Sequence, residues 1–177
     1  MEIRHKPAYH FAPPRNWLND PNGMIHWKGT YHLFYQYVPF SAGNGVKHWG
    51  HAASRDLAHW EHRPIALSPT PGGPDKDGVW SGCAIHWDGL PLVFYTGVFP
   101  EMQCLAVGDD TLNTWTKYDG NPIIAAPPEG LAVTGFRDPC VWREADGWYL
   151  ALGSGIEGGH GMVLLYRSDD LLTWEYL

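Results

Sequence analysis

The sequence predicts an all-β protein made of three similar units, each a four-stranded sheet like one blade of a β-propeller. Two signals recur along its 177 residues with nearly one period. The first is a Trp between a β-rich run and a Gly-containing turn, at Trp27, Trp87 and Trp142. The second is a Leu-x-x-Trp pattern that ends at Trp60, Trp115 and Trp174. Because the two signals are independent and share one period, we interpret them as a structural repeat.

Each unit is expected to begin with a β-hairpin. The paired β-rich runs cover residues 24–27 and 30–37, then 84–87 and 90–95, then 141–142 and 148–152. A short turn that contains Gly separates the two runs of each pair, which is typical of a hairpin. Pro- and Gly-rich segments at 68–74 and 125–130 fall between the units and are interpreted as connections between blades.

The predicted blades are residues 16–70, 77–125 and 134–177, and no second domain is expected within the chain. Propellers close with about four to eight blades. Three blades therefore represent part of a ring, and we expect their open edges to favour self-association.

The composition excludes several classes of function. The formal net charge is −7 and there is no run of Lys or Arg, so a nucleic-acid surface is not expected. No apolar run is long enough to span a membrane. The polar N-terminus has no apolar signal segment, which predicts a cytoplasmic protein, although a secreted protein trimmed of its signal would look the same. The three Cys lack metal-ligand spacing and are interpreted as free buried thiols.

Two carboxylates stand just before the repeated hairpins. Asp20 lies in Asn-Trp-Leu-Asn-Asp-Pro-Asn-Gly at residues 16–23, and Asp138 lies in Phe-Arg-Asp-Pro at residues 136–139. Both precede a Pro, which stiffens the backbone at the carboxylate. Corresponding first strands face the central channel of a propeller, so we expect both carboxylates in one pocket. Paired carboxylates in a Trp-rich pocket are typical of glycoside hydrolysis.

These motifs resemble those of glycoside hydrolase family 32, the invertases and fructan hydrolases. The similarity continues through Tyr-His-Leu-Phe-Tyr-Gln-Tyr at 31–37, His-Trp-Gly-His-Ala at 48–52 and Trp-Ser-Gly at 80–82, and covers the chain from about residue 9. The resemblance implies a five-bladed propeller that carries the active site and needs no cofactor. It also implies retaining hydrolysis of terminal β-fructofuranosides, such as sucrose or fructo-oligosaccharides.

The resemblance implies a role for Asp20 as nucleophile and for Asp138 as transition-state stabiliser. It places a set of aromatic, amide, hydroxyl and guanidinium side chains against the sugar: Trp17, Asn19, Gln36, Trp49, Trp80, Ser81, Tyr95 and Arg137. The family's acid/base Glu belongs to a Glu-Cys motif, and this sequence contains no Glu-Cys pair. The glutamates Glu101, Glu129, Glu144, Glu157 and Glu175 fall in predicted loops or blade edges, and none is assigned this role.

Several readings remain open. The chain is the front part of a longer enzyme, an inactive fragment or fructoside-binding module, or one component whose partner supplies the missing blades. A five-bladed hydrolase of pentose polymers is a further alternative. A metal site at His48 and His51 or at His59 and His62 is not expected, because side chains three apart on a strand point to opposite faces.

Overall fold

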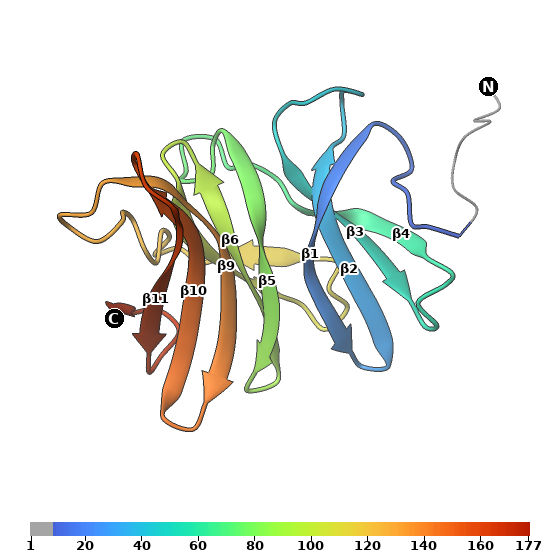
Figure 1. The fold of residues 1–177 in the computed structure, drawn as a ribbon. Helices are drawn as coiled ribbons and strands as arrows, with labels where there is room; N and C mark the ends of the chain where they lie inside the picture. Colours follow the sequence, from blue (N-terminus) through green and yellow to red (C-terminus); the bar gives the residue numbers. More distant parts are fainter. Residues whose placement is uncertain (1–8) are drawn as a thin grey trace.

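A computed structural model describes residues 9–177, which form three antiparallel four-stranded sheets (Figure 1). The first sheet contains β1 (Trp17–Trp27), β2 (Thr30–Val38), β3 (His48–Ser54) and β4 (Glu61–Leu67). The second contains β5 (Gly78–Trp87), β6 (Leu90–Val98), β7 (Met102–Gly108) and β8 (Trp115–Lys117). The third contains β9 (Val133–Glu144), β10 (Gly147–Ile156), β11 (Gly161–Ser168) and β12 (Glu175–Tyr176). The predicted all-β class is confirmed, with three sheets of the expected size.

Strands follow one another in sequence order within every sheet. The described residues contain no helix with the length and apolar character needed to cross a membrane. The connections between sheets, residues 68–77 and 118–132, contain the Pro- and Gly-rich segments that were expected to join blades.

The three predicted hairpins are present, and two of them share a turn type. Lys28 and Gly29 have φ angles of 45° and 79°, and Asp88 and Gly89 have φ angles of 50° and 74°. Two successive residues with positive φ make the type I′ turn that suits a two-residue hairpin. In the third hairpin Gly147 pairs with Glu144, so the turn lies one residue earlier than the Asp-Gly pair suggested.

The first strands of the sheets lie side by side along the inner edge of the molecule. β5 contacts both β1 and β9, and it lies between them in Figure 1. Residues at corresponding positions of these strands therefore meet, as a propeller requires.

Apolar side chains fill the space between successive sheets. One buried cluster joins the first two sheets and includes Phe34, Trp49 and Leu112. A second joins the second and third sheets and includes Phe94, Leu152 and Leu171. The burial of these large side chains is the main force that holds the sheets together.

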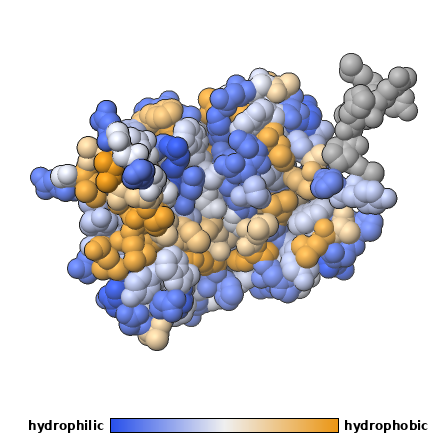
Figure 2. All heavy atoms as spheres, viewed as in Figure 1, coloured by the Kyte–Doolittle hydropathy of each residue, from blue (hydrophilic) through white to orange (hydrophobic). Residues whose placement is uncertain are grey.

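The outward faces of the first and third sheets are only partly covered. Phe11 packs on the first sheet beside Tyr35 and Trp60. Val163 and Leu165 of β11 remain exposed, and Figure 2 shows apolar surface at the end of the molecule that carries β11. Self-association through these faces stays a prediction.

Candidate active site

A pocket of about 300 Å³ opens where the three inner strands meet. All three sheets contribute to its wall, together with the loop between β2 and β3. The residues that line it are Trp17, Asn19, Asp20, Gln36, Asn44, Lys47, Trp80, Ser81, Arg137 and Asp138. Both predicted carboxylates and six of the eight predicted sugar contacts therefore come together in one place.

The same backbone irregularity carries the site residues in every sheet. Two residues of the inner strand oppose one of its partner between Leu18 and Pro21, between Val79 and Gly82, and between Arg137 and Cys140. Such a β-bulge bends the strand and redirects its side chains. Asp20, Ser81 and Asp138 sit within these bulges. The Pro that follows each Asp suits this position, because it has no N–H to donate to the ladder.

Asp20 is exposed to the pocket and is held by one hydrogen bond from the neighbouring sheet. Ser81 Oγ donates to Asp20 Oδ2 at 2.7 Å. This bond orients the carboxylate and leaves its other oxygen, Oδ1, free to face a bound molecule.

Asp138 has an unusual backbone and a perturbed pKa. Its φ is 61°, in the left-handed region that non-Gly residues seldom adopt, and its side chain is 52% exposed. Burial raises the pKa of its carboxyl group, Arg137 opposes this rise, and the negative charges of Asp20 and Glu101 add to it. The carboxylates of the first and third sheets therefore lie close enough to influence each other.

Arg137 is fixed by a carboxylate that the sequence did not place near the site. Its Nη1 donates to Glu101 Oε1 at 2.7 Å, and its guanidinium lies 5.8 Å from the ring centroid of Trp80. Glu101 lies in the turn between β6 and β7, as expected for a loop residue. Its side chain nevertheless holds Arg137, a residue of the pocket wall, through a long-range contact for which the repeat carried no signal.

Trp17 and Trp80 supply the flat apolar surface of the pocket, with a cation beside both rings. Lys47 Nζ lies 5.4 Å from the ring centroid of Trp17 and 5.8 Å from that of Trp80. The ammonium group also donates to Asn44 Oδ1. Asn44 and Lys47 were missed because their loop has neither a repeat nor a motif of known chemistry.

Two predicted sugar contacts do not reach the pocket. Trp49 is fully buried between the first two sheets, and its Nε1 donates to the backbone oxygen of Trp80 at 2.9 Å. Tyr95 is also fully buried, and its hydroxyl donates to Asp75 Oδ2 at 2.9 Å. The prediction that Trp49 and Tyr95 contact the sugar is therefore wrong, because the packing of neighbouring sheets encloses both rings. Their hydrogen bonds support the pocket wall from behind.

Gln36 lines the pocket although it is almost fully buried, and its Nε2 donates to the backbone oxygen of Val79 at 3.1 Å. His51 is buried as well, and it meets His32 at 2.9 Å between ring nitrogens. Burial lowers the pKa of His51 to about 3, so its ring is neutral. Residues 9–177 bring no three metal-ligating side chains together in a group that could hold an ion.

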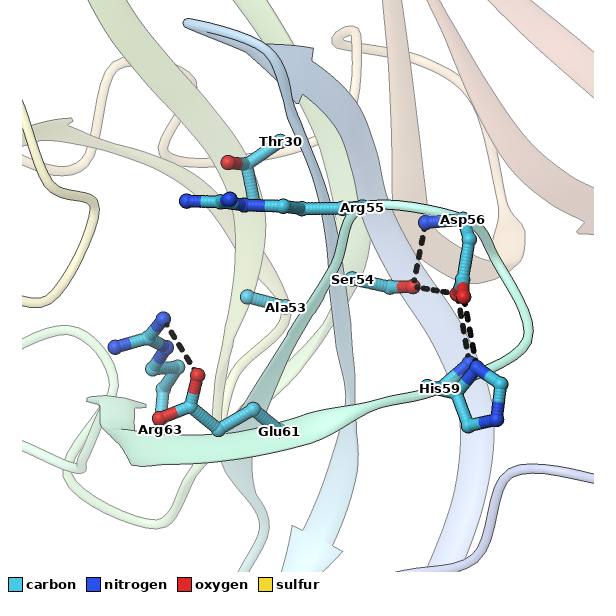
Figure 3. Close-up of a pocket in the computed structure, with 8 residues that line it drawn as sticks. All are labelled: Thr30, Ala53, Ser54, Arg55, Asp56, His59, Glu61 and Arg63. Atoms are coloured by element: carbon cyan, nitrogen blue, oxygen red, sulfur yellow. Dashed lines mark hydrogen bonds and ion pairs between the residues drawn. The ribbon is translucent and has the colours of Figure 1, made fainter.

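A second hollow lies on the outer part of the first sheet (Figure 3). Its lining residues are Thr30, Ala53, Ser54, Arg55, Asp56, His59, Glu61 and Arg63. Here Arg63 pairs with Glu61 at 2.9 Å, and His59 pairs with Asp56 at 2.7 Å. These charges are satisfied locally, and this hollow contains none of the residues predicted to bind sugar.

The profile described as "Glycosyl hydrolases family 32 N-terminal domain" matches residues 10–177. The chain belongs to glycosyl hydrolase family 32. It is 42% identical over 181 residues to the sucrose-6-phosphate hydrolase of Escherichia coli, covering 96% of this chain and 36% of that protein. It is 44% identical over 185 residues to beta-fructofuranosidase 1 of Zea mays, covering 96% and 27% respectively.

The fold of the family 32 chain also matches a solved structure closely. The crystal structure of fructan 1-exohydrolase IIa from Cichorium intybus superposes with a TM-score of 0.92 at 40% identity, over 100% of this chain and 34% of that one. The chain thus spans about a third of the length of the relatives that it matches.

Proposed function

We propose that the protein is a retaining β-fructofuranosidase that cleaves terminal fructofuranosides such as sucrose, and that this chain supplies two of its catalytic carboxylates. The observation that carries the proposal is the convergence of Asp20 and Asp138 from different sheets on one Trp-lined pocket. Indole faces pack on sugar rings, while amides, hydroxyls and a guanidinium orient sugar hydroxyls. Membership of family 32 supports the same reaction.

In the first step, Asp20 Oδ1 attacks the anomeric carbon of the fructosyl unit. A carboxylate ester forms, the glycosidic C–O bond breaks, and the departing oxygen takes a proton from a general acid. In the second step water attacks the same carbon and gives a proton back to the group that served as general acid, the ester breaks, and the Asp20 carboxylate is restored. Ser81 suits this reaction because it holds Oδ2 and leaves Oδ1 for attack.

Asp138 stabilises the transition state in this proposal. Its carboxylate accepts hydrogen bonds from fructose hydroxyls, and these bonds strengthen as positive charge develops on the sugar. Arg137 beside it binds a further hydroxyl. We assign none of the described glutamates as the proton donor of the first step, because none of them lines the pocket.

Substitution of the two carboxylates, made in the protein with its full encoded sequence, tests the proposal. Asp20→Asn should lower kcat for sucrose by at least about a thousandfold, because the nucleophile is lost. Asp138→Asn should lower kcat by about a hundredfold or more. Glucose release measures both effects.

Asp88→Asn is the matched control, because this exposed carboxylate sits in a remote hairpin turn that Asn tolerates equally well. Rapid acid quench should also trap a fructosyl adduct on the peptide that contains Asp20. Wild-type turnover that survives Asp20→Asn, or an adduct on another peptide, would contradict the assignment of the nucleophile.

A second candidate substrate is a fructoside that carries a phosphate group. Lys47 supports it, because its ammonium group faces the pocket and has no ion-pair partner within the described residues. A relative in Escherichia coli is named sucrose-6-phosphate hydrolase. Charge-assisted hydrogen bonds to phosphate are stronger than those to neutral hydroxyls.

Lys47→Gln separates the two substrates. The substitution should lower kcat/KM for sucrose 6-phosphate by about tenfold to a hundredfold, and change that for sucrose by less than about threefold. Lys28→Gln, on an exposed hairpin far from the pocket, is the control. An equal loss for both sugars would mean that Lys47 does not select phosphate.

A further inference from the structure

The corner of the third sheet that enters the pocket, residues 136–138, is held by side chains of the second sheet. Asp138 needs such support, because its φ of 61° is unfavourable for a residue with a Cβ. Several contacts from the surrounding structure must therefore hold this backbone conformation, so that the carboxylate keeps one position.

Three residues of β6, β7 and their connecting turn provide that support. Thr96 Oγ1 accepts the backbone N–H of Asp138 at 3.0 Å, and Gln103 Nε2 donates to the backbone oxygen of Phe136 at 2.7 Å. Glu101 Oε2 accepts the backbone N–H of Phe136 at 2.6 Å, while its Oε1 accepts Arg137 Nη1 at 2.7 Å. We call Thr96, Glu101 and Gln103 the bracket.

Two members of the bracket, Thr96 and Gln103, are connected to each other and shielded from solvent. Thr96 and Gln103 are neighbours across the β6–β7 ladder, both are fully buried, and Thr96 Oγ1 donates to Gln103 Oε1 at 2.9 Å. The hydrogen-bond directions are thus set: the Asp138 N–H donates to Thr96, and Thr96 donates to Gln103. Loss of any member leaves a buried polar group without its partner, which is costly.

The placement of the bracket distinguishes it from general packing between sheets. The clusters that join the second and third sheets elsewhere are apolar. The bracket instead directs four hydrogen bonds to three consecutive residues, two of which, Arg137 and Asp138, line the pocket.

We propose that Thr96, Glu101 and Gln103 are positioning residues that hold Arg137 and Asp138 in the geometry that binds the fructosyl unit in the transition state. This inference rests on the proposed function. Glu101 has two effects: it holds the guanidinium at 2.7 Å while Arg137 Nε stays 4.0 Å from Asp138 Oδ2, and it places a negative charge nearby.

Thr96→Val and Glu101→Gln test the proposal in the protein with its full encoded sequence. Thr96→Val keeps the shape of the side chain and removes the hydroxyl. It should lower kcat for sucrose by about tenfold to a hundredfold, because a small displacement of a catalytic group has effects of this size. KM should change by less than about threefold, since the Asp138 contacts strengthen mainly in the transition state. Thr96→Ser should restore most of kcat.

Glu101→Gln has a second readout, the titration of Asp138 followed by carboxyl ¹³C NMR. The substitution removes a negative neighbour and frees Arg137 to approach, and both changes lower the pKa of Asp138. Thr116→Val, in exposed β8, should leave kcat, KM and this titration unchanged.

The outcomes are separable. Wild-type kcat in both Thr96→Val and Glu101→Gln, with an unchanged Asp138 titration, would overturn the positioning role. If Thr96→Val does not fold, kcat of Thr96→Ser and Glu101→Gln decides in its place. If the wild-type protein cleaves no fructoside, the proposed function fails, while the NMR titration still shows whether Glu101 controls the Asp138 carboxylate.

Discussion

The inner edge and the outer edge of the molecule each repeat a backbone feature three times. The inner edge repeats a β-bulge, and the outer edge repeats a tight turn. At the outer edge, the turn after the third strand of each sheet has the same geometry. Leu57, Leu112 and Leu171 have φ angles of 64°, 57° and 67°. In each turn the following Trp donates its Nε1 to that Leu backbone oxygen, at 3.2, 3.0 and 3.1 Å. At the inner edge the bulges repeat, but their side chains differ. Backbone repetition therefore builds the scaffold, and variation within the bulge supplies the chemistry.

The outer turns also show how one local structure can have different surroundings. Leu112 and Leu171 are 0% and 3% exposed, because each packs against the preceding sheet. Leu57 is 57% exposed, since no preceding sheet is present among the described residues. The turn conformation depends on local hydrogen bonds, whereas its contribution to the core depends on a neighbour.

The largest effect should come from truncating the buried members of this set. Leu112→Ala and Leu171→Ala should each lower the free energy of unfolding of the 177-residue chain by about 3 kcal/mol, because each leaves a cavity between sheets. Leu57→Ala should change it by less than about 0.5 kcal/mol. Urea unfolding measures all three. Similar losses at the three positions would show that each Leu side chain stabilises the protein through contacts within its own turn, rather than through contacts with the preceding sheet.

The inner bulges should be sensitive to volume in a way that the outer loops are not. A Cβ on Gly82 would lie 1.9 Å from the backbone oxygen of Phe94, so Gly82→Ala requires the bulge beside Ser81 to move. We expect a loss of about 2–3 kcal/mol. Gly161→Ala is the control, because its Cβ meets nothing within 4 Å. Equal thermal unfolding temperatures for the two variants would argue against a tight bulge.

Each outer turn contains a hydrogen bond from a hydroxyl to a carboxylate two residues away. In the second turn the two residues stand in the opposite order. Ser54 Oγ donates to Asp56 Oδ1 at 3.1 Å in the first turn, and Ser168 Oγ donates to Asp170 at 3.0 Å in the third. In the second turn the carboxylate comes first, and Thr111 Oγ1 donates to Asp109 Oδ1 at 2.9 Å.

A double-mutant cycle sharpens this point. Asp109→Ser and Thr111→Asp should each lower the free energy of unfolding by about 1 kcal/mol, because each removes one side of the pair. The double variant recreates the Ser-x-Asp order of the other turns, so it should lie within about 0.5 kcal/mol of wild type. Simple addition of the single effects would show that the two orders are not equivalent.

The smallest effect is a pH dependence of the outer turns. The backbone N–H groups of Thr173 and Leu172 lower the pKa of Asp170 below its ordinary value of 3.8. The stabilisation is therefore complete above pH 3.8 and is lost as pH falls through the lowered pKa. Asp170→Asn should lower the unfolding temperature at pH 6, and the difference from wild type should shrink toward pH 2. A difference independent of pH would contradict this origin.

Much of the site could be predicted because its signals are local in the sequence. An Asp followed by Pro and a Trp-Ser-Gly triplet mark the three bulges, and six of eight predicted sugar contacts line the pocket with both carboxylates. The errors involve side chains whose chemistry matches that of true lining residues. Trp49 and Trp80 look alike in the sequence, and only the packing of the second sheet on the first buries one and leaves the other at the pocket.

The sequence by itself determined the three hairpins and the order of the sheets, and its Leu-x-x-Trp pattern marked where the outer turns recur, because Gly, Pro, Asp and Trp act on the backbone within a few residues. Only the tertiary structure decided that Glu101 and Thr96 hold the corner at Asp138, and that Lys47 lies beside two indoles. The physical reason is the separation of the contacting residues along the sequence. These contacts join residues that lie 30 to 42 positions apart in the sequence. They therefore exist only once the apolar faces have packed and set the distance between the inner strands.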